Sequence, residues 1–121
     1  MKTLNDAINY YNADKYSEAL DVLNECINSR NAKPTASDYR WRGKTHYQLN
    51  HYQEALVDLN HCIQLRNDKP DANDYYLRGL THYKLSHYQE ALVDLNHCIQ
   101  LRNDKPEAKD YHWRGKTHFQ L

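Results

Sequence analysis

The sequence contains few residues that interrupt regular structure, with three glycines and three prolines among 121 residues. Long regular elements joined by short turns are therefore expected. The longest apolar runs are only three or four residues, so no segment is expected to span a membrane. The first residues, MKTLNDAINYYN, contain no apolar stretch typical of a signal peptide.

An excess of charge of one sign is also missing, because 16 Lys and Arg residues balance 16 Asp and Glu residues. The whole chain therefore presents no basic field for nucleic acid. Cysteine is scarce and odd in number: Cys26, Cys62 and Cys98 are spaced by 36 residues, which is not a paired disulfide framework. This usage favours a reducing cytoplasm.

An internal repeat is the main feature that is present. The segment HYQEALVDLNHCIQLRNDKP occupies residues 51–70 and returns unchanged at residues 87–106. A shift of 36 residues also aligns Gly43, Gly79 and Gly115. A fixed period of this length predicts a repeat architecture. Since exposed positions such as Gln53 and Gln89 are copied too, the identity indicates a recent duplication or a designed concatenation.

Each period contains two helical patterns. The second pattern forms one apolar stripe at helical spacing, made in the copy at 51–70 by Tyr52, Ala55, Leu56, Leu59, Cys62 and Ile63. The first pattern begins after the turn, where Thr35 precedes Asp38 and Asp71 precedes Asp74. Ser86 with Gln89 predicts a capping box at the second helix, and Asn50 with Gln53 predicts a weaker one.

The predicted fold class is all-α, with about seven helices arranged as three antiparallel hairpins and a final lone helix. A hairpin this small cannot bury its own stripe, so the hairpins are expected to stack into a solenoid.

The residues that carry the repeat resemble a known family. The order Tyr39, Gly43, Tyr47, Tyr52, Ala55, Leu59, Cys62 and Pro70 is similar to the tetratricopeptide repeat, a helix–turn–helix unit usually 34 residues long. The resemblance implies a right-handed solenoid with units at 1–34 (with a shortened first helix), 35–70 and 71–106. Residues 107–121 then form the first helix of a fourth unit, or a capping helix.

The sequence departs from this family at several positions. Its period is 36 residues, Arg42, Arg78 and Arg114 stand where leucine is usual, and cysteine replaces an alanine of the second helix. Asp14, Asn50 and Ser86 stand where a glycine usually joins the two helices.

Cysteines and histidines provide the only candidates for chemistry. We expect the cysteines to be small buried packing residues, in the positions that the family fills with alanine. The eight histidines show no H-x-x-x-H or Cys/His spacing of a metal site. The sequence therefore predicts neither an enzyme nor a metal or cofactor site.

Two arginines have a structural interpretation. Arg42 and Arg78 each precede an aspartate, Asp58 and Asp94, by sixteen residues, and the first repeat lacks both partners. The joint absence predicts an ion pair within each hairpin, worth about 0–1 kcal/mol if exposed. On that hypothesis Arg78→Leu is nearly neutral for stability.

The resemblance also implies a concave groove lined by the first helix of each unit. The groove residues are then Arg40, Trp41, Lys44, Tyr47, Gln48, Asn73, Tyr76, Leu77, Leu80, Tyr83, Lys84, Lys109, His112, Trp113, Lys116 and Phe119. Basic and aromatic groups alternate among them, which indicates an acidic peptide with apolar side chains as the ligand. The alternative for the same residues is a set of solvated helix faces in a spacer.

Some relatives in this family bind chaperone tails through a carboxylate clamp of lysines, arginine and two asparagines. The corresponding positions here are Arg40, Lys44, Leu77, Lys109 and Trp113, so both asparagines are missing and a chaperone tail is disfavoured.

Two functions follow from the sequence. The first is a protein-interaction scaffold or adaptor that binds a peptide or protein segment in the groove, with no nucleic-acid or membrane partner. The second is a structural or engineered repeat array that associates head to tail through its unpaired last helix.

Overall fold

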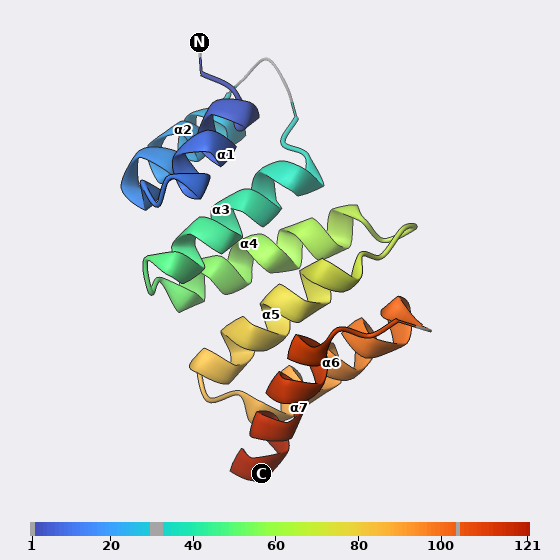
Figure 1. The fold of residues 1–121 in the computed structure, drawn as a ribbon. Helices are drawn as coiled ribbons and strands as arrows, with labels where there is room; N and C mark the ends of the chain where they lie inside the picture. Colours follow the sequence, from blue (N-terminus) through green and yellow to red (C-terminus); the bar gives the residue numbers. More distant parts are fainter. Residues whose placement is uncertain (1, 30–32, 104) are drawn as a thin grey trace. The chain divides into compact units, whose positions relative to one another are not determined.

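A computed structural model describes residues 2–29, 33–103 and 105–121 (Figure 1). Asp104, in the second copy of the turn RNDKP, lies outside these residues. In the described part the chain forms seven α-helices and no strand, which confirms the all-α class. The helices are α1 (Leu4–Asn12), α2 (Tyr16–Asn28), α3 (Ala36–Gln48), α4 (Tyr52–Leu65), α5 (Ala72–Lys84), α6 (Tyr88–Arg102) and α7 (Ala108–Gln120).

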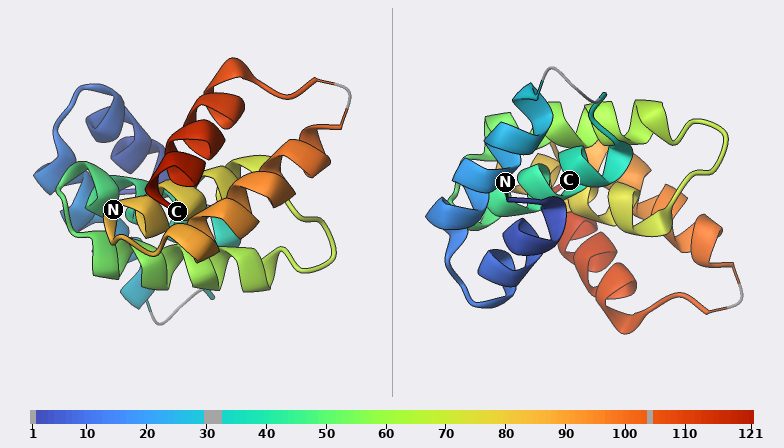
Figure 2. Two further views of the ribbon diagram at one scale, coloured as in Figure 1. Left: turned by 90° about the horizontal axis from the view of Figure 1, so that it is seen from below. Right: turned by 90° about the horizontal axis from the view of Figure 1, so that it is seen from above.

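The chain divides by its internal contacts into two compact units. The N-terminal unit, Met1–Leu65, contains α1 to α4, and the C-terminal unit, Arg66–Leu121, contains α5 to α7. Within the first, α1 pairs with α2 and α3 with α4; within the second, α5 pairs with α6, and α7 packs mainly on α6 (Figure 2). No helix in the described ranges is long and apolar enough to cross a bilayer.

The helices α3 and α5 begin where the sequence predicts. The Asp38 backbone N–H donates to the Thr35 hydroxyl at 3.2 Å, and the Thr35 backbone N–H donates to the Asp38 carboxylate at 2.9 Å. This reciprocal pair is a capping box, and it satisfies two amides at the start of α3. At α5, the Asp71 carboxylate accepts from the Asn73 N–H at 2.8 Å.

The capping boxes predicted at the second helices are wrong. Ser86 has a φ of 62° and Asn50 a φ of 63°, so both adopt the left-handed conformation of a residue that joins two helices. The N-cap of α6 is His87, which makes no side-chain capping bond. The Ser86 hydroxyl instead accepts a hydrogen bond from the Tyr88 hydroxyl at 3.4 Å. Ser86 is therefore a residue of the turn between α5 and α6 and not the N-cap of α6.

Replacing Ser86 by glycine is expected to stabilise the protein. The left-handed conformation costs an L-residue roughly 1–2 kcal/mol, and glycine avoids most of that cost. Asn50→Gly should stabilise less, because asparagine tolerates this conformation better. It also accepts a shorter bond, 2.8 Å, from the Tyr52 hydroxyl. Thermal unfolding monitored by circular dichroism should therefore give the highest midpoint for Ser86→Gly, followed by Asn50→Gly and then wild type. A midpoint for Ser86→Gly below that of wild type would contradict the turn assignment.

The core of each hairpin is the predicted apolar stripe. Ala55, Leu59 and Cys62 of α4 are buried, as are the equivalent residues of α6, Ala91, Leu95 and Cys98. This burial confirms that these two cysteines are packing residues, while Cys26 is half-buried. All three cysteines are thiols. Burial, with a smaller contribution from Asp110, raises the pKa of Cys98 to about 11, so its thiol stays protonated and unreactive.

Candidate functional site

The predicted ion pairs are present in both hairpins. The Arg42 guanidinium donates twice to Asp58, and Arg78 donates twice to Asp94, with all four distances at 2.8 Å. The expectation that these pairs are exposed is wrong, however, because Asp58 and Asp94 are each only 2% exposed. The sixteen-residue spacing predicted the partners, but the position of the aspartate on the inner side of its helix decides the burial.

Two further buried ion pairs were missed in the sequence. The Arg66 Nε atom lies 2.9 Å from the Asp74 carboxylate, and the Arg102 Nε atom lies 2.7 Å from that of Asp110, which is 0% exposed. Arg102 also donates to the Asn73 side chain at 3.0 Å. Arg66 directly follows α4 and Arg102 ends α6, so each pair connects the end of a second helix to the first turn of the next helix. A spacing of eight residues, repeated with the 36-residue period, is the sequence pattern that could have predicted them.

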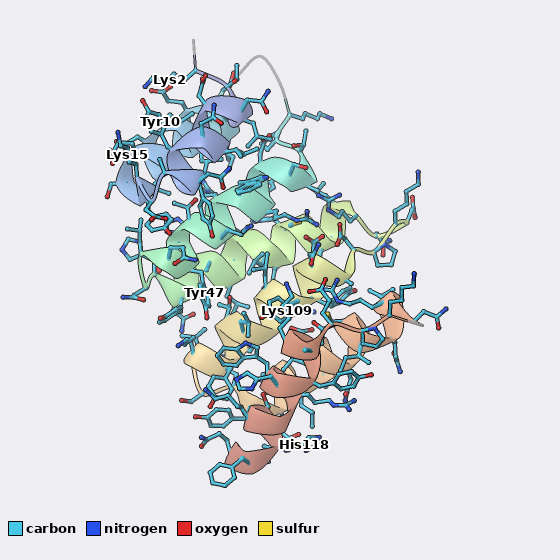
Figure 3. All side chains as sticks on the ribbon, viewed as in Figure 1. Lys2, Tyr10, Lys15, Tyr47, Lys109 and His118 are labelled. Atoms are coloured by element: carbon cyan, nitrogen blue, oxygen red, sulfur yellow. The ribbon has the colours of Figure 1, made fainter. Side chains whose placement is uncertain are left out.

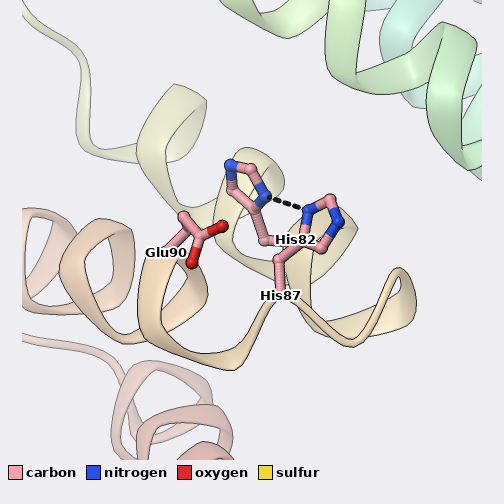
Figure 4. Close-up of side chains that lie close together, drawn as sticks. All are labelled: His82, His87 and Glu90. Atoms are coloured by element: carbon pink, nitrogen blue, oxygen red, sulfur yellow. Dashed lines mark hydrogen bonds between the residues drawn. The ribbon is translucent and has the colours of Figure 1, made fainter.

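A pair of histidines lies at the turn of two hairpins, α3–α4 and α5–α6. The Nδ1 atoms of His46 and His51 are 3.1 Å apart, and so are those of His82 and His87 (Figure 4). One nitrogen of each pair must carry a proton to donate to the other. Residues five apart across a turn can meet in this way, although they would not meet on a continuous helix.

Within the pair of His82 and His87, the environment of His82 favours its neutral form. Burial is the largest influence on the pKa of His82, and it lowers this pKa. The charges of Asp94 and Glu90 oppose the shift, whereas Arg78 and His87 add to it. The folded state therefore resists protonation of His82. Neutral His82 makes its full contribution to the free energy of unfolding above the ordinary histidine pKa of about 6.5. This contribution declines as the pH falls through the lowered pKa of the folded state.

Aromatic and basic side chains gather where α5 meets α7, and we call this group the C-terminal aromatic cluster. The Tyr83 and Trp113 rings meet edge to face with centroids 5.3 Å apart. The Lys116 ammonium lies 4.7 Å from the Trp113 centroid, and that of Lys109, labelled in Figure 3, lies 4.4 Å from the Tyr76 centroid. These five residues were all predicted as groove residues, and the structure brings them together within one unit.

The same arrangement occurs in the N-terminal unit, and we call it the N-terminal aromatic cluster. Tyr11 of α1 meets Trp41 edge to face at 5.3 Å, and the Lys44 ammonium lies 4.3 Å from the Trp41 centroid. Gln48 donates to the Tyr11 hydroxyl at 3.2 Å. Tyr11 was not among the predicted residues, although it precedes Tyr47 by one period of 36 residues.

Other predicted groove residues lie outside these clusters. Leu80 is only 7% exposed, so its assignment as a ligand-contacting residue needs correction; it belongs to the core. Asn73 is held by Arg102 at the start of α5. Phe119 is 88% exposed on α7. The remaining predicted residues lie on α3 (Arg40 and Tyr47), on α5 (Leu77 and Lys84) and on α7 (His112). Of these, His112 borders the C-terminal aromatic cluster, with its ring centroid 5.8 Å from that of Trp113.

Tyr47 illustrates how a predicted binding residue can also be architectural. Its ring meets Tyr52 edge to face at 5.5 Å, and Tyr83 meets Tyr88 in the same way at 5.4 Å. These contacts brace the turn between the two helices of a hairpin.

Comparison with known families agrees with this geometry. The profile described as tetratricopeptide repeat matches residues 39–69 and 75–105, which together make up about half of the chain. The chain belongs to the tetratricopeptide repeat family. Among curated proteins, no sequence matches it.

Solved structures with tetratricopeptide repeats share the fold. The Arabidopsis OM64 TPR domain is 19% identical with a TM-score of 0.83, and the alignment covers 95% of this chain and 90% of that domain. The first TPR of Spaghetti (RPAP3), bound to the HSP90 peptide SRMEEVD, is 18% identical with the same TM-score, over 95% of this chain and 86% of its own. At these identities the likeness establishes an all-α helical repeat fold.

Proposed function

We propose that this tetratricopeptide repeat protein is an interaction module that binds acidic peptide or protein segments with apolar side chains at its aromatic clusters. The observation that carries the proposal is the recurrence of one arrangement, a tryptophan edge-on to a tyrosine with a lysine over the indole, in both units. The role is one of binding and not of catalysis. Three cysteine thiols are consistent with a reducing compartment such as the cytoplasm.

The chemistry of the clusters favours a ligand of this class. Half-buried Trp113 and Tyr76 offer flat apolar area at low entropic cost, as binding hot spots do. Lys109 and Lys116 are exposed, so their ammonium groups can pair with carboxylates of a ligand.

The peptide bound by the Spaghetti (RPAP3) domain, SRMEEVD, is also acidic. In the present chain Leu77 and Trp113 stand at positions where a chaperone-tail clamp has asparagine and a basic residue. We therefore propose a ligand recognised by side-chain carboxylates and apolar anchors, without a requirement for a terminal carboxylate.

A titration followed by tryptophan fluorescence tests this proposal. A soluble peptide with several glutamates around one leucine and one phenylalanine should give a saturable change, and added salt should weaken the binding because the attraction is partly ionic. The same peptide with glutamine at every glutamate should bind at least about tenfold more weakly. Equal binding of the two peptides would contradict an acidic ligand.

A matched pair of charge reversals locates the site. Lys116→Glu places a negative charge beside Trp113, whereas Lys105→Glu makes the same change at an exposed turn residue outside the cluster. We expect the first to weaken the acidic peptide by about tenfold or more and the second to have little effect. Equal losses in both variants would indicate general charge attraction without a specific site.

A specific observation also favours a second function, head-to-tail self-association. A Cβ atom added at Gly115 meets nothing within 4 Å, whereas one added at Gly43 or Gly79 meets Leu59 or Leu95 of the following helix. Together with the exposed Phe119, this describes a face of α7 suited to cover by a further helix. Sedimentation velocity over a range of concentrations should then show association that Phe119→Glu abolishes, and a strict monomer at high concentration would exclude it.

A further inference from the structure

Three side chains with metal-ligating atoms lie close together at the turn between α5 and α6. His82 lies in the last turn of α5, His87 is the N-cap of α6, and Glu90 lies in the first turn of α6. One ligand atom from each lies within 4.8 Å of the other two. Figure 4 shows the Glu90 carboxylate and the His87 ring on either side of the His82 ring.

The spacing of the two imidazoles suits a tetrahedral metal ion. Zinc binds histidine nitrogen at about 2.0–2.1 Å, so two nitrogens on one tetrahedral zinc lie roughly 3.3 Å apart. The Nδ1 atoms of His82 and His87 are 3.1 Å apart. Glu90 is exposed, so its carboxylate can approach the pair by rotation about its side-chain bonds.

The surroundings of His82 support a ligand role. Its other nitrogen, Nε2, lies 3.9 Å from the Asp94 carboxylate, which is buried and held by two hydrogen bonds from Arg78. At 3.9 Å the carboxylate accepts no direct hydrogen bond from this nitrogen. Its negative charge on that side of the ring favours a proton on Nε2 and so leaves Nδ1 to the metal.

We propose that His82, His87 and Glu90 form a site for zinc or a similar borderline divalent metal, with the fourth position open to water. Two imidazoles and one carboxylate are a known zinc ligand set, whereas magnesium and calcium prefer oxygen ligands alone. A metal here joins the end of α5 to the start of α6, across the left-handed residue Ser86. None of the site's three residues belongs to an aromatic cluster, and its role is to hold the two helices of the hairpin together.

The pattern rule used on the sequence could not predict this site. That rule required histidines four residues apart on one helix, and here the ligands are five and three residues apart across a turn. The N-terminal unit has the corresponding residues His46, His51 and Glu54, but His51 is exposed and, in the described part of the chain, Glu54 does not join its histidines within the same distance.

The experiment uses the tag-free chain with His51→Gln, which removes the corresponding pair in the N-terminal unit. Titration with cobalt(II) should give the visible absorption of a tetrahedral site at one equivalent per chain, without the thiolate bands that cysteine ligands produce. Zinc should displace the cobalt and raise the thermal midpoint, because a ligand that binds only the folded state stabilises it.

In this background Glu90→Gln and His87→Gln should each weaken metal binding by at least about tenfold. Glu90→Gln changes an exposed side chain, so its result does not depend on whether the histidine variant folds well. His97→Gln, on the exposed side of the same helix, is the matched control and should leave the affinity unchanged. Absence of a saturable cobalt spectrum, or equal affinity for Glu90→Gln and His97→Gln, overturns the proposal.

Discussion

Arg78→Leu is expected to lower the free energy of unfolding by about 3 kcal/mol, although it installs the residue usual in this family. The change leaves the Asp94 carboxylate, 2% exposed, without the guanidinium that donates to both of its oxygens at 2.8 Å. His82 Nε2, at 3.9 Å, is too distant to replace these bonds. Urea unfolding followed by circular dichroism measures the loss.

Two further variants separate the buried charge from the loss of arginine packing. Arg78→Leu combined with Asp94→Leu should recover most of the stability, because an apolar pair replaces a buried ion pair at little cost. Arg114→Leu makes the same substitution in α7, where the arginine donates to Asn96 at 3.4 Å and lies over the Tyr111 ring. Its cost should be below about 1 kcal/mol. Equal costs for Arg78→Leu and Arg114→Leu would show that the Asp94 carboxylate remains hydrated.

Gly79→Ala and Gly115→Ala are expected to change stability in opposite directions. A Cβ atom at position 79 lies 3.1 Å from Leu95 Cγ and 3.4 Å from the Ala91 carbonyl oxygen. Leu95 is fully buried and the carbonyl belongs to a helix, so neither moves without strain. Overpacking of this kind costs about 1–3 kcal/mol, which exceeds the helix-propensity gain of about 1 kcal/mol.

At Gly115 only the propensity gain remains, because an added Cβ meets nothing within 4 Å. Gly115→Ala should therefore stabilise the protein by about 0.5–1 kcal/mol, whereas Gly79→Ala should destabilise it by about 1 kcal/mol. The same urea experiment measures both variants. A destabilised Gly115→Ala would show that another chain covers this face of α7, and sedimentation of that variant would then identify the association.

Periodicity predicted the fold because each repeat is a local unit of 36 residues with its own stripe and turn. The Arg42–Asp58 partnership was also predictable, since the first repeat lacks both members. The burial of Asp58 was not predictable, because it depends on how far α4 is rotated against α3. The role of Ser86 was misassigned because the motif S-x-x-Q does not reveal whether the serine adopts a positive φ.

The candidate sites were less predictable because they also depend on the geometry of helices and turns. Family resemblance assigned Trp113 and Lys116 to a binding face, and the structure adds that Tyr83 supports the indole. Tyr11 was missed because its helix is shorter than the others, although its position in the period is the same. The meeting of His82 with His87 depends on the geometry of the turn, which residue spacing alone does not define.

The most direct test of the binding proposal is nuclear magnetic resonance of the isotope-labelled protein during titration with the acidic peptide. The chain contains two tryptophans, Trp41 and Trp113, one in each aromatic cluster, so each indole N–H signal reports on one cluster. The proposal predicts saturable shifts of these indole signals with the acidic peptide and none with its glutamine counterpart. Saturable shifts elsewhere in the protein, with both indole signals unmoved, would contradict it.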